Sequence, residues 1–81
     1  MVKIKNKDKY ESTDFNLVVA LACSGHIVLD VIGGKQKKFY LKDTDKLQDD
    51  IKMYYRREML VDPVSFYNEA KLLKNRIYEN N

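Results

Sequence analysis

The sequence has one cysteine, one proline and three glycines among its 81 residues, and each shortage excludes a class of protein. A single cysteine cannot form an intramolecular disulfide, which favours a reducing compartment. One histidine beside it falls short of a zinc site, so we expect no metal and no other cofactor. So little glycine and proline excludes linker-like or low-complexity composition. No internal repeat is present, which argues against a solenoid.

Long hydrophobic runs are also absent. The longest, residues 17–23, is much shorter than the roughly 20 residues that span a bilayer. Residues 1–10 are charged where a signal peptide needs an apolar stretch. Hydrophobic residues still make up 44% of the chain, enough for a small core. The sequence therefore predicts one domain over residues 1–81, in the cytoplasm of the cell, with no membrane contact and no room for a two-lobed enzyme.

The first predicted helix covers residues 14–24. Ser12 or Thr13 can accept hydrogen bonds from its free amides, and Gly25 is suited to end it. Between residues 15 and 23 only Asn16 is polar, so the helix lacks a polar face. We expect it to be covered on most sides.

Two strand-like segments, residues 26–32 and 37–42, are separated by a glycine pair and predict a β-hairpin. Directly paired residues share one face of a sheet, so the buried residues must pair with one another. The predicted pairs are Leu29 with Phe39, Ile27 with Leu41, and Asp30 with Lys38. This register needs a three-residue loop, residues 33–35; a two-residue glycine turn is the less favoured alternative.

Two more helices follow. Asp43 or Thr44 caps the second, which ends near residue 56 and buries Leu47, Ile51, Tyr54 and Tyr55. Asp62 and Pro63 are typical of a helix start, and this last helix runs to about residue 79 with Phe66, Ala70, Leu73 and Ile77 as its inner stripe. Residues 59–61 are a loop or a third strand. The predicted class is α+β, with three helices packed on a small antiparallel sheet in the order α-β-β-α-(β)-α.

A set of cap positions and apolar positions carries a resemblance to a known family. They are Ser12-Thr13-Asp14, Gly25, Phe39-Tyr40-Leu41, Tyr54-Tyr55, Val61-Asp62-Pro63 and residues 66–78. Over about residues 11–79 the chain resembles a family of small proteins of unknown function, encoded by phages and other mobile elements of bacteria, mostly Firmicutes. The resemblance implies a phage-type accessory protein acting inside a bacterial host cell. It carries over no catalytic or binding residue.

The distribution of charge is more informative than the formal net charge of +3, which is too small to predict a polyanion partner. Residues 1–10 carry four lysines and form either a flexible basic arm or an edge strand. Residues 35–42 carry four more lysines and no acid. The acids gather instead at residues 43–50.

The lysines of the hairpin form the first candidate site. The register exposes Lys38, Tyr40 and Lys42 on one strand, where lysines would meet phosphates and the tyrosine ring would stack on a base. The full predicted nucleic-acid site comprises Lys35, Lys37, Lys38, Tyr40 and Lys42, with Arg56 and Arg57 as additional candidates. The alternative explanation is that lysines at a hairpin tip serve solubility and block edge pairing.

The same outer face predicts a different function. Val28, Ile32 and Tyr40 make it more apolar than a solvated face requires. Three covers are open: the N-terminal segment folding back through Val2 and Ile4, a second copy of the chain, or a host or phage protein. The acidic start of the second helix, with Asp45 and Asp49, is a further surface for a basic protein partner. The runner-up hypothesis is therefore an inhibitor or adaptor that binds a protein, including as a homodimer.

Catalysis is not indicated. Cys23 and His26 invite comparison with a nucleophile and its base, yet Cys23 lies in the apolar helix and no third group orients the histidine. We expect a packed thiol and a half-exposed strand histidine. The acids at residues 43–50 lack the pattern of a calcium loop and suit the positive end of a helix dipole. We expect no enzyme activity.

Overall fold

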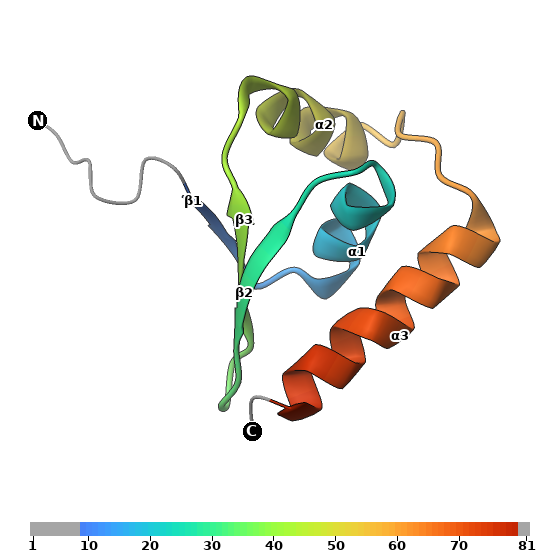
Figure 1. Cartoon of the computed structure of the whole chain (residues 1–81). Helices are drawn as coiled ribbons and strands as arrows, with labels where there is room; N and C mark the ends of the chain where they lie inside the picture. The colour runs from blue at the N-terminus through green and yellow to red at the C-terminus, as the bar shows by residue number, and fades with distance from the viewer. Residues whose placement is uncertain (1–8, 80–81) are drawn as a thin grey trace, which may run out of the picture.

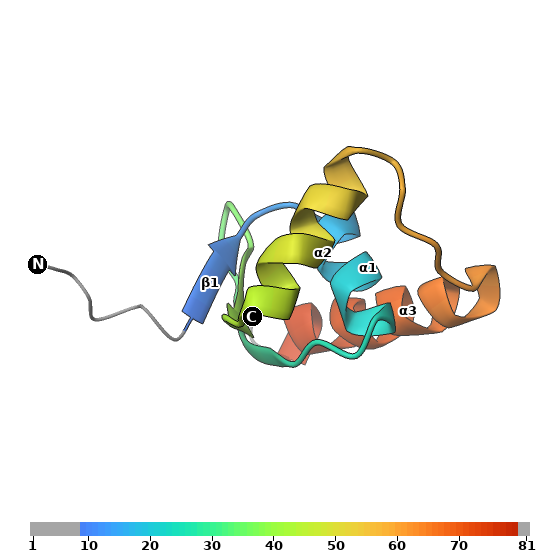
Figure 2. The same cartoon turned by 90° about the horizontal axis from the view of Figure 1, so that it is seen from above.

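The computed structural model describes residues 9–79, which form three strands and three helices. In chain order these are β1 (Lys9–Ser12), α1 (Phe15–Cys23), β2 (Val28–Ile32), β3 (Lys38–Lys42), α2 (Asp45–Tyr55) and α3 (Pro63–Glu79). The strands form one antiparallel sheet in the order β1-β3-β2. All three helices lie on one side of this sheet (Figures 1 and 2). The predicted α+β class, with helices on a small antiparallel sheet, is confirmed.

The third strand is β1, which overlaps the predicted basic arm or edge strand at residues 9 and 10 and continues to Ser12. It pairs with β3 so that Tyr10 lies opposite Leu41 and Ser12 opposite Phe39. Tyr10 packs on the core and Ser12 is buried, so this strand covers one side of β3. Residues 59–61 form no strand, and the order is β-α-β-β-α-α. Of the predicted basic arm or edge strand, residues 1–8 lie outside the described residues.

Local hydrogen bonds define both ends of α1. Asp14 is its N-cap, and the carboxylate accepts from the amide of Leu17 at 3.2 Å; Ser12 instead accepts from the amide of Asp14. At the other end Gly25 adopts φ +95°. The amides of Gly25 and His26 donate hydrogen bonds to carbonyls of the last turn, which is the pattern of a Schellman motif. The predicted stop at Gly25 is confirmed, and this motif positions His26.

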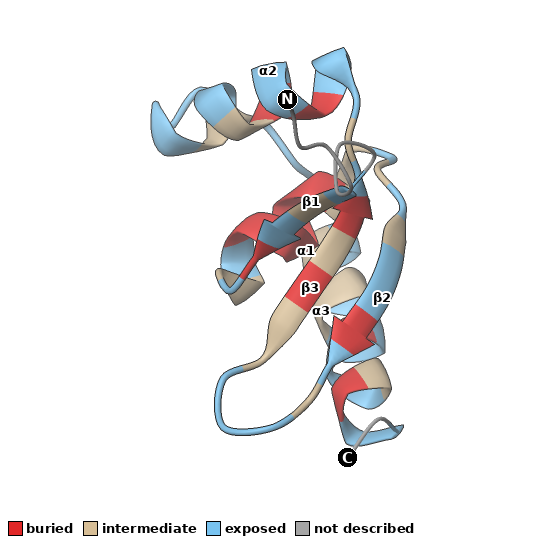
Figure 3. Cartoon of the chain, turned by 90° about the vertical axis from the view of Figure 1, so that its left-hand side faces the viewer, coloured by how far each residue is buried: buried red, intermediate tan, exposed pale blue. Residues whose placement is uncertain are grey.

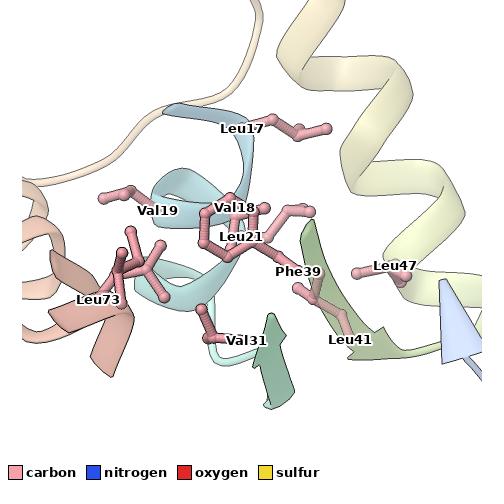
Figure 4. Close-up of a cluster of buried hydrophobic side chains, with 10 residues drawn as sticks. Leu17, Val18, Val19, Leu21, Val31, Phe39, Leu41, Leu47 and Leu73 are labelled. Carbon is pink, nitrogen blue, oxygen red and sulfur yellow. The ribbon is translucent and has the colours of Figure 1, made fainter. Parts of the chain in front are cut away.

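The core surrounds α1, which packs between the sheet and the other two helices (Figures 1 and 4). Its members are Leu17, Val18, Val19, Leu21, Val31, Phe39, Leu41, Leu47, Leu73 and Ile77. α1 contributes four of these ten residues, as expected of a helix that is apolar nearly all round. Phe39 and Leu41 of the central strand are 1% and 0% exposed, so their predicted inward orientation is confirmed.

The predicted register of the hairpin is wrong. Residues 33–37 form a five-residue loop, and the observed pairs are Ile32 with Lys38, Val31 with Phe39, Asp30 with Tyr40 and Val28 with Leu41. A β-bulge lies between Val28 and Asp30. Val31 and Val28 therefore face the helices, whereas Ile27 and Leu29, both predicted inward, are 59% and 43% exposed.

Two long-range contacts accompany this register. The side chain of His26 is buried against Asp50 of α2, and the carbonyl of Val28 accepts a hydrogen bond from Arg76 of α3 at 2.9 Å. The side chains of His26 and Val28 face inward at even positions, while Val31 faces inward at an odd one. The bulge supplies the change of phase, since two residues of β2 there oppose one residue of β3.

The remaining helices begin where local signals predict. The hydroxyl of Thr44 accepts from the amide of Leu47 at 3.0 Å, and the carboxylate of Asp62 accepts from the amide of Ser65 at 2.8 Å. The predicted inner stripe of α3 is confirmed, because all its members belong to the core or pack against it. On α2, Tyr55 is 59% exposed rather than buried, and Asp50 takes the inward position.

Candidate nucleic-acid interface

The open face of the sheet is the surface of β1, β3 and β2 that points away from the helices, and Figure 3 looks directly onto it. On β3 the buried Phe39 and Leu41 alternate with Lys38, Tyr40 and Lys42. Successive side chains of a strand point to opposite faces, so the last three lie on the open face. The side chain of Lys38 is 45% exposed, and Lys42 is exposed. The structure therefore leaves these three side chains uncovered by the helices.

The loop of the hairpin adds two further lysines. Lys35 is exposed, and the Nζ of Lys37 donates to the carbonyl of Gly34 at 2.7 Å. Gly34 adopts φ +113°, a backbone conformation that other residues rarely take. The five predicted hairpin residues are thus brought together along β3 and the loop that precedes it.

Acidic neighbours reduce the charge of the open face. Tyr40 lies between Asp30 of β2 and Glu11 of β1. Glu11 approaches Lys38 at 3.8 Å, and both side chains are about half exposed, so this pair contributes little to stability and is screened by salt. Lys9 of β1 lies opposite Lys42. Three lysines against two acids leave the open face with a small excess of positive charge.

The two arginines lie elsewhere. Arg56 and Arg57 follow the end of α2 that points away from the sheet (Figures 1 and 2). Arg57 adopts φ +63°. Its amide and that of Glu58 donate hydrogen bonds to carbonyls in the last turn of α2, so Arg57 is the left-handed residue that ends the helix. The structure does not bring these arginines to the hairpin lysines.

The sequence did not predict that residues of α3 lie beside the hairpin loop. Lys74, Ile77 and Tyr78, at the C-terminal end of α3, line a small pocket together with Lys37 of the hairpin loop. These segments are far apart in the sequence, and only the packing angle of α3 brings them together. No local pattern could have revealed this.

The residues of the alternative protein interface fall on separate surfaces. Ile32 is 45% exposed and shares the open face with Tyr40. Val28 does not belong there, because it pairs with Leu41 and packs on the core, a consequence of the bulge. Asp45 and Asp49 are exposed on α2. The structure therefore divides the predicted interface into an apolar part on the sheet and an acidic part on α2.

His26 is a buried partner of Asp50 and not the half-exposed strand residue that was predicted. Its Nε2 lies 2.7 Å from Oδ2 of Asp50, and the two side chains are 8% and 13% exposed. Lys46 donates to the same oxygen at 2.8 Å. The bonds from Lys46 and His26 lower the pKa of Asp50 below its usual value. This cluster of hydrogen bonds joins the segment before β2 to α2, and its geometry is that of a structural contact.

The other features considered from the sequence were a reactive cysteine, a metal site and a membrane span. Cys23 packs on the core, and burial, with the nearby charges of Glu69 and Asp62, raises the pKa of its thiol. A raised pKa favours the protonated thiol over the nucleophilic thiolate. Within residues 9–79 no group of three or more histidine, cysteine or acidic side chains is placed to hold a metal ion. None of the helices in this range is long and apolar enough to span a membrane.

Comparison with known proteins identifies a family but no characterised relative. No curated protein and no solved structure matches the chain. A family model described as a domain of unknown function, DUF5659, matches residues 7–79, which include every helix and strand described above. The chain therefore belongs to the DUF5659 family.

Proposed function

We propose that this chain is a non-enzymatic protein that binds nucleic acid through the hairpin. The observation that supports the proposal is the alternation on β3, where Phe39 and Leu41 are buried and Lys38, Tyr40 and Lys42 lie on the open face. An aromatic ring flanked by cations on a sheet suits a flexible strand, since every base has a face that can stack and every linkage carries a charge. Lys35 and Lys37 extend the cationic track beyond the strand.

The neighbours of Tyr40 set the strength of this binding. Glu11 and Asp30 flank the ring, so the attraction to phosphate comes from a small excess of positive charge. Binding of this kind is modest in affinity and weakens as the salt concentration rises. We propose a phage-type accessory role in a bacterial cytoplasm as the setting, in keeping with the resemblance noted from the sequence.

The first prediction concerns charge reversal on the open face. Lys38→Glu combined with Lys42→Glu should abolish most binding to a fluorescent oligonucleotide at low salt. For any residual binding, the plot of log affinity against log salt should become shallower by roughly 1.4, since each lost phosphate contact on a single strand removes about 0.7 from the slope. Fluorescence anisotropy over a salt series measures both.

The matched control is Lys52→Glu combined with Lys71→Glu, which makes the same change of net charge at exposed helix positions. This control should bind like the wild type. Equal losses in both double variants would show that only total charge matters. An unmodified chain that binds no oligonucleotide at low salt would refute the proposal.

A second candidate function, association with a protein through the open face, is favoured by the apolar residues of β2. Leu29 and Ile32 on this edge strand, and Ile27 directly before it, are all more than 40% exposed. We propose a homodimer as its simplest form, with a host or phage protein as the other partner class, and the acids Asp45 and Asp49 as the surface for a basic partner.

Ile32→Lys separates the two functions. It places a charge in the apolar part of the open face, so a dimer formed there should become a monomer in sedimentation velocity. The same substitution should preserve or strengthen nucleic-acid binding, because it adds a cation opposite Lys38 on the open face. A wild-type chain that sediments as a monomer at every concentration would exclude the homodimer.

A further inference from the structure

A small pocket lies where the hairpin loop meets the C-terminal end of α3. Figures 1 and 2 both place these segments side by side. The pocket has a volume of about 310 Å³ and is lined by Lys37, Lys74, Ile77 and Tyr78. It is distinct from the open face, although Lys37 directly precedes the first residue of β3.

Among the described residues that line the pocket, two are lysines and none is acidic. Lys37 donates to a neutral backbone carbonyl, and the Nζ of Lys74 lies 5.9 Å from the centre of the Phe15 ring. Within residues 9–79 the ion pairs are formed by His26, Lys38 and Lys46, and neither pocket lysine takes part. The two acids of α3, Glu69 and Glu79, line a different groove. Two lysine side chains lining one small pocket favour an anionic group such as phosphate.

The rest of the pocket is apolar and aromatic. Ile77 is 9% exposed and belongs to the core, so it forms a fixed floor. Tyr78 is 73% exposed, and most of its ring is therefore available for stacking. A planar ring over an apolar floor is the surface on which a nucleobase packs. The volume is at the lower end for small-molecule sites, enough for one such unit.

We propose that this pocket binds one nucleotide unit, with its phosphate between Lys37 and Lys74 and its base against Tyr78. The proposal rests on the proposed function and deepens it, because it names the form of nucleic acid. A base in a duplex is stacked and paired, whereas a base in a single strand is free to turn toward the tyrosine. The chain therefore prefers single strands. A free nucleotide offers the same chemistry, and the experiment distinguishes the two sources.

The test uses the full chain with a fluorescent single-stranded oligonucleotide, the same sequence as a duplex, and adenosine monophosphate. Tyr78→Ala and Lys74→Glu are compared with Tyr67→Ala and Lys71→Glu, which make the same changes at exposed positions of the same helix. Each pocket variant should lose about 10-fold in affinity for the single strand, since one stacked base or one phosphate contact is lost. Tyr78→Ala should also reduce the preference for single strand over duplex, with the remainder due to Tyr40. The control variants should bind within about twofold of the wild type.

The outcomes separate this inference from the function on which it rests. If the oligonucleotide binds and both pocket variants behave like their controls, the pocket is not used, while binding by the open face stands. If adenosine monophosphate binds, Tyr78→Ala abolishes this, and no oligonucleotide binds, the pocket takes free nucleotides and the proposed function is wrong. A chain that binds none of the three probes overturns both. Circular dichroism confirms that the variants are folded.

Discussion

Phe39→Ala is expected to lower the free energy of unfolding by about 4 kcal/mol, the largest stability effect we predict. Phe39 is 1% exposed at the centre of the middle strand, opposite Ser12 on one side and Val31 on the other. Its ring also packs on Phe15, with the ring centres 6.2 Å apart. Truncation leaves a cavity that two strands and α1 cannot close without moving. A small domain has a total stability of roughly 5 kcal/mol, so most of it would be lost.

Urea denaturation followed by circular dichroism measures this loss. Tyr40→Ala is the matched control, because it removes a neighbouring aromatic ring from the open face of the same strand. We expect that variant to lose less than about 1 kcal/mol. Similar losses in the two variants would mean that β3 does not present Phe39 to the core and Tyr40 to the outside, and the candidate interface would lose its basis.

Asp50→Ala is expected to lower the free energy of unfolding by about 2 kcal/mol. The bond to His26 accounts for most of this, since both side chains are nearly buried and the ring would lose its partner. The bond from Lys46 contributes little because that side chain is 70% exposed. Asp49→Ala removes an exposed carboxylate from the adjacent position and should be nearly neutral. Equal effects in the two variants would show that the clamp between β2 and α2 does not stabilise the fold.

The same carboxylate predicts how stability responds to acid. Asp50 has a lowered pKa in the folded chain, so it stays ionised there at a pH where the unfolded chain, with the usual value of 3.8, binds a proton. Its contribution is therefore present above about pH 5 and is lost as the pH falls through the folded pKa. The difference in stability between the wild type and Asp50→Asn should shrink over this range in urea denaturation series. A difference that stays constant down to pH 3 would contradict the assignment.

The features that could be predicted from the sequence depend on neighbouring residues. Thr44 and Asp62 mark helix starts because a side-chain oxygen and the free amides of a first turn are close in sequence. The alternation of β3 was predictable because polar and apolar residues alternate along residues 38–42 and successive side chains of a strand point to opposite faces. The outward position of Lys38, Tyr40 and Lys42 follows from that alternation.

The features that could not be predicted depend on contacts between distant segments. The phase of β2 depends on the tertiary packing, in which His26 meets Asp50 of α2 and the side chain of Val28 packs on the core. An alternating apolar pattern offers two registers, and no local signal chooses between them. The pocket of Lys74 and Tyr78 depends on the angle of α3 in the same way. The sequence pointed to the lysines of the hairpin but not to the residues of α3 that line a pocket with Lys37.

The central claim, that the hairpin binds nucleic acid with its outward residues, is tested most directly by an NMR titration of the labelled chain with a single-stranded oligonucleotide at low salt. We predict the largest amide shifts in β3, in residues 33–37 and in the last turns of α3. The amides of Arg56 and Arg57 should not move. Spectra that stay unchanged, or shifts confined to the acidic start of α2, would contradict the claim.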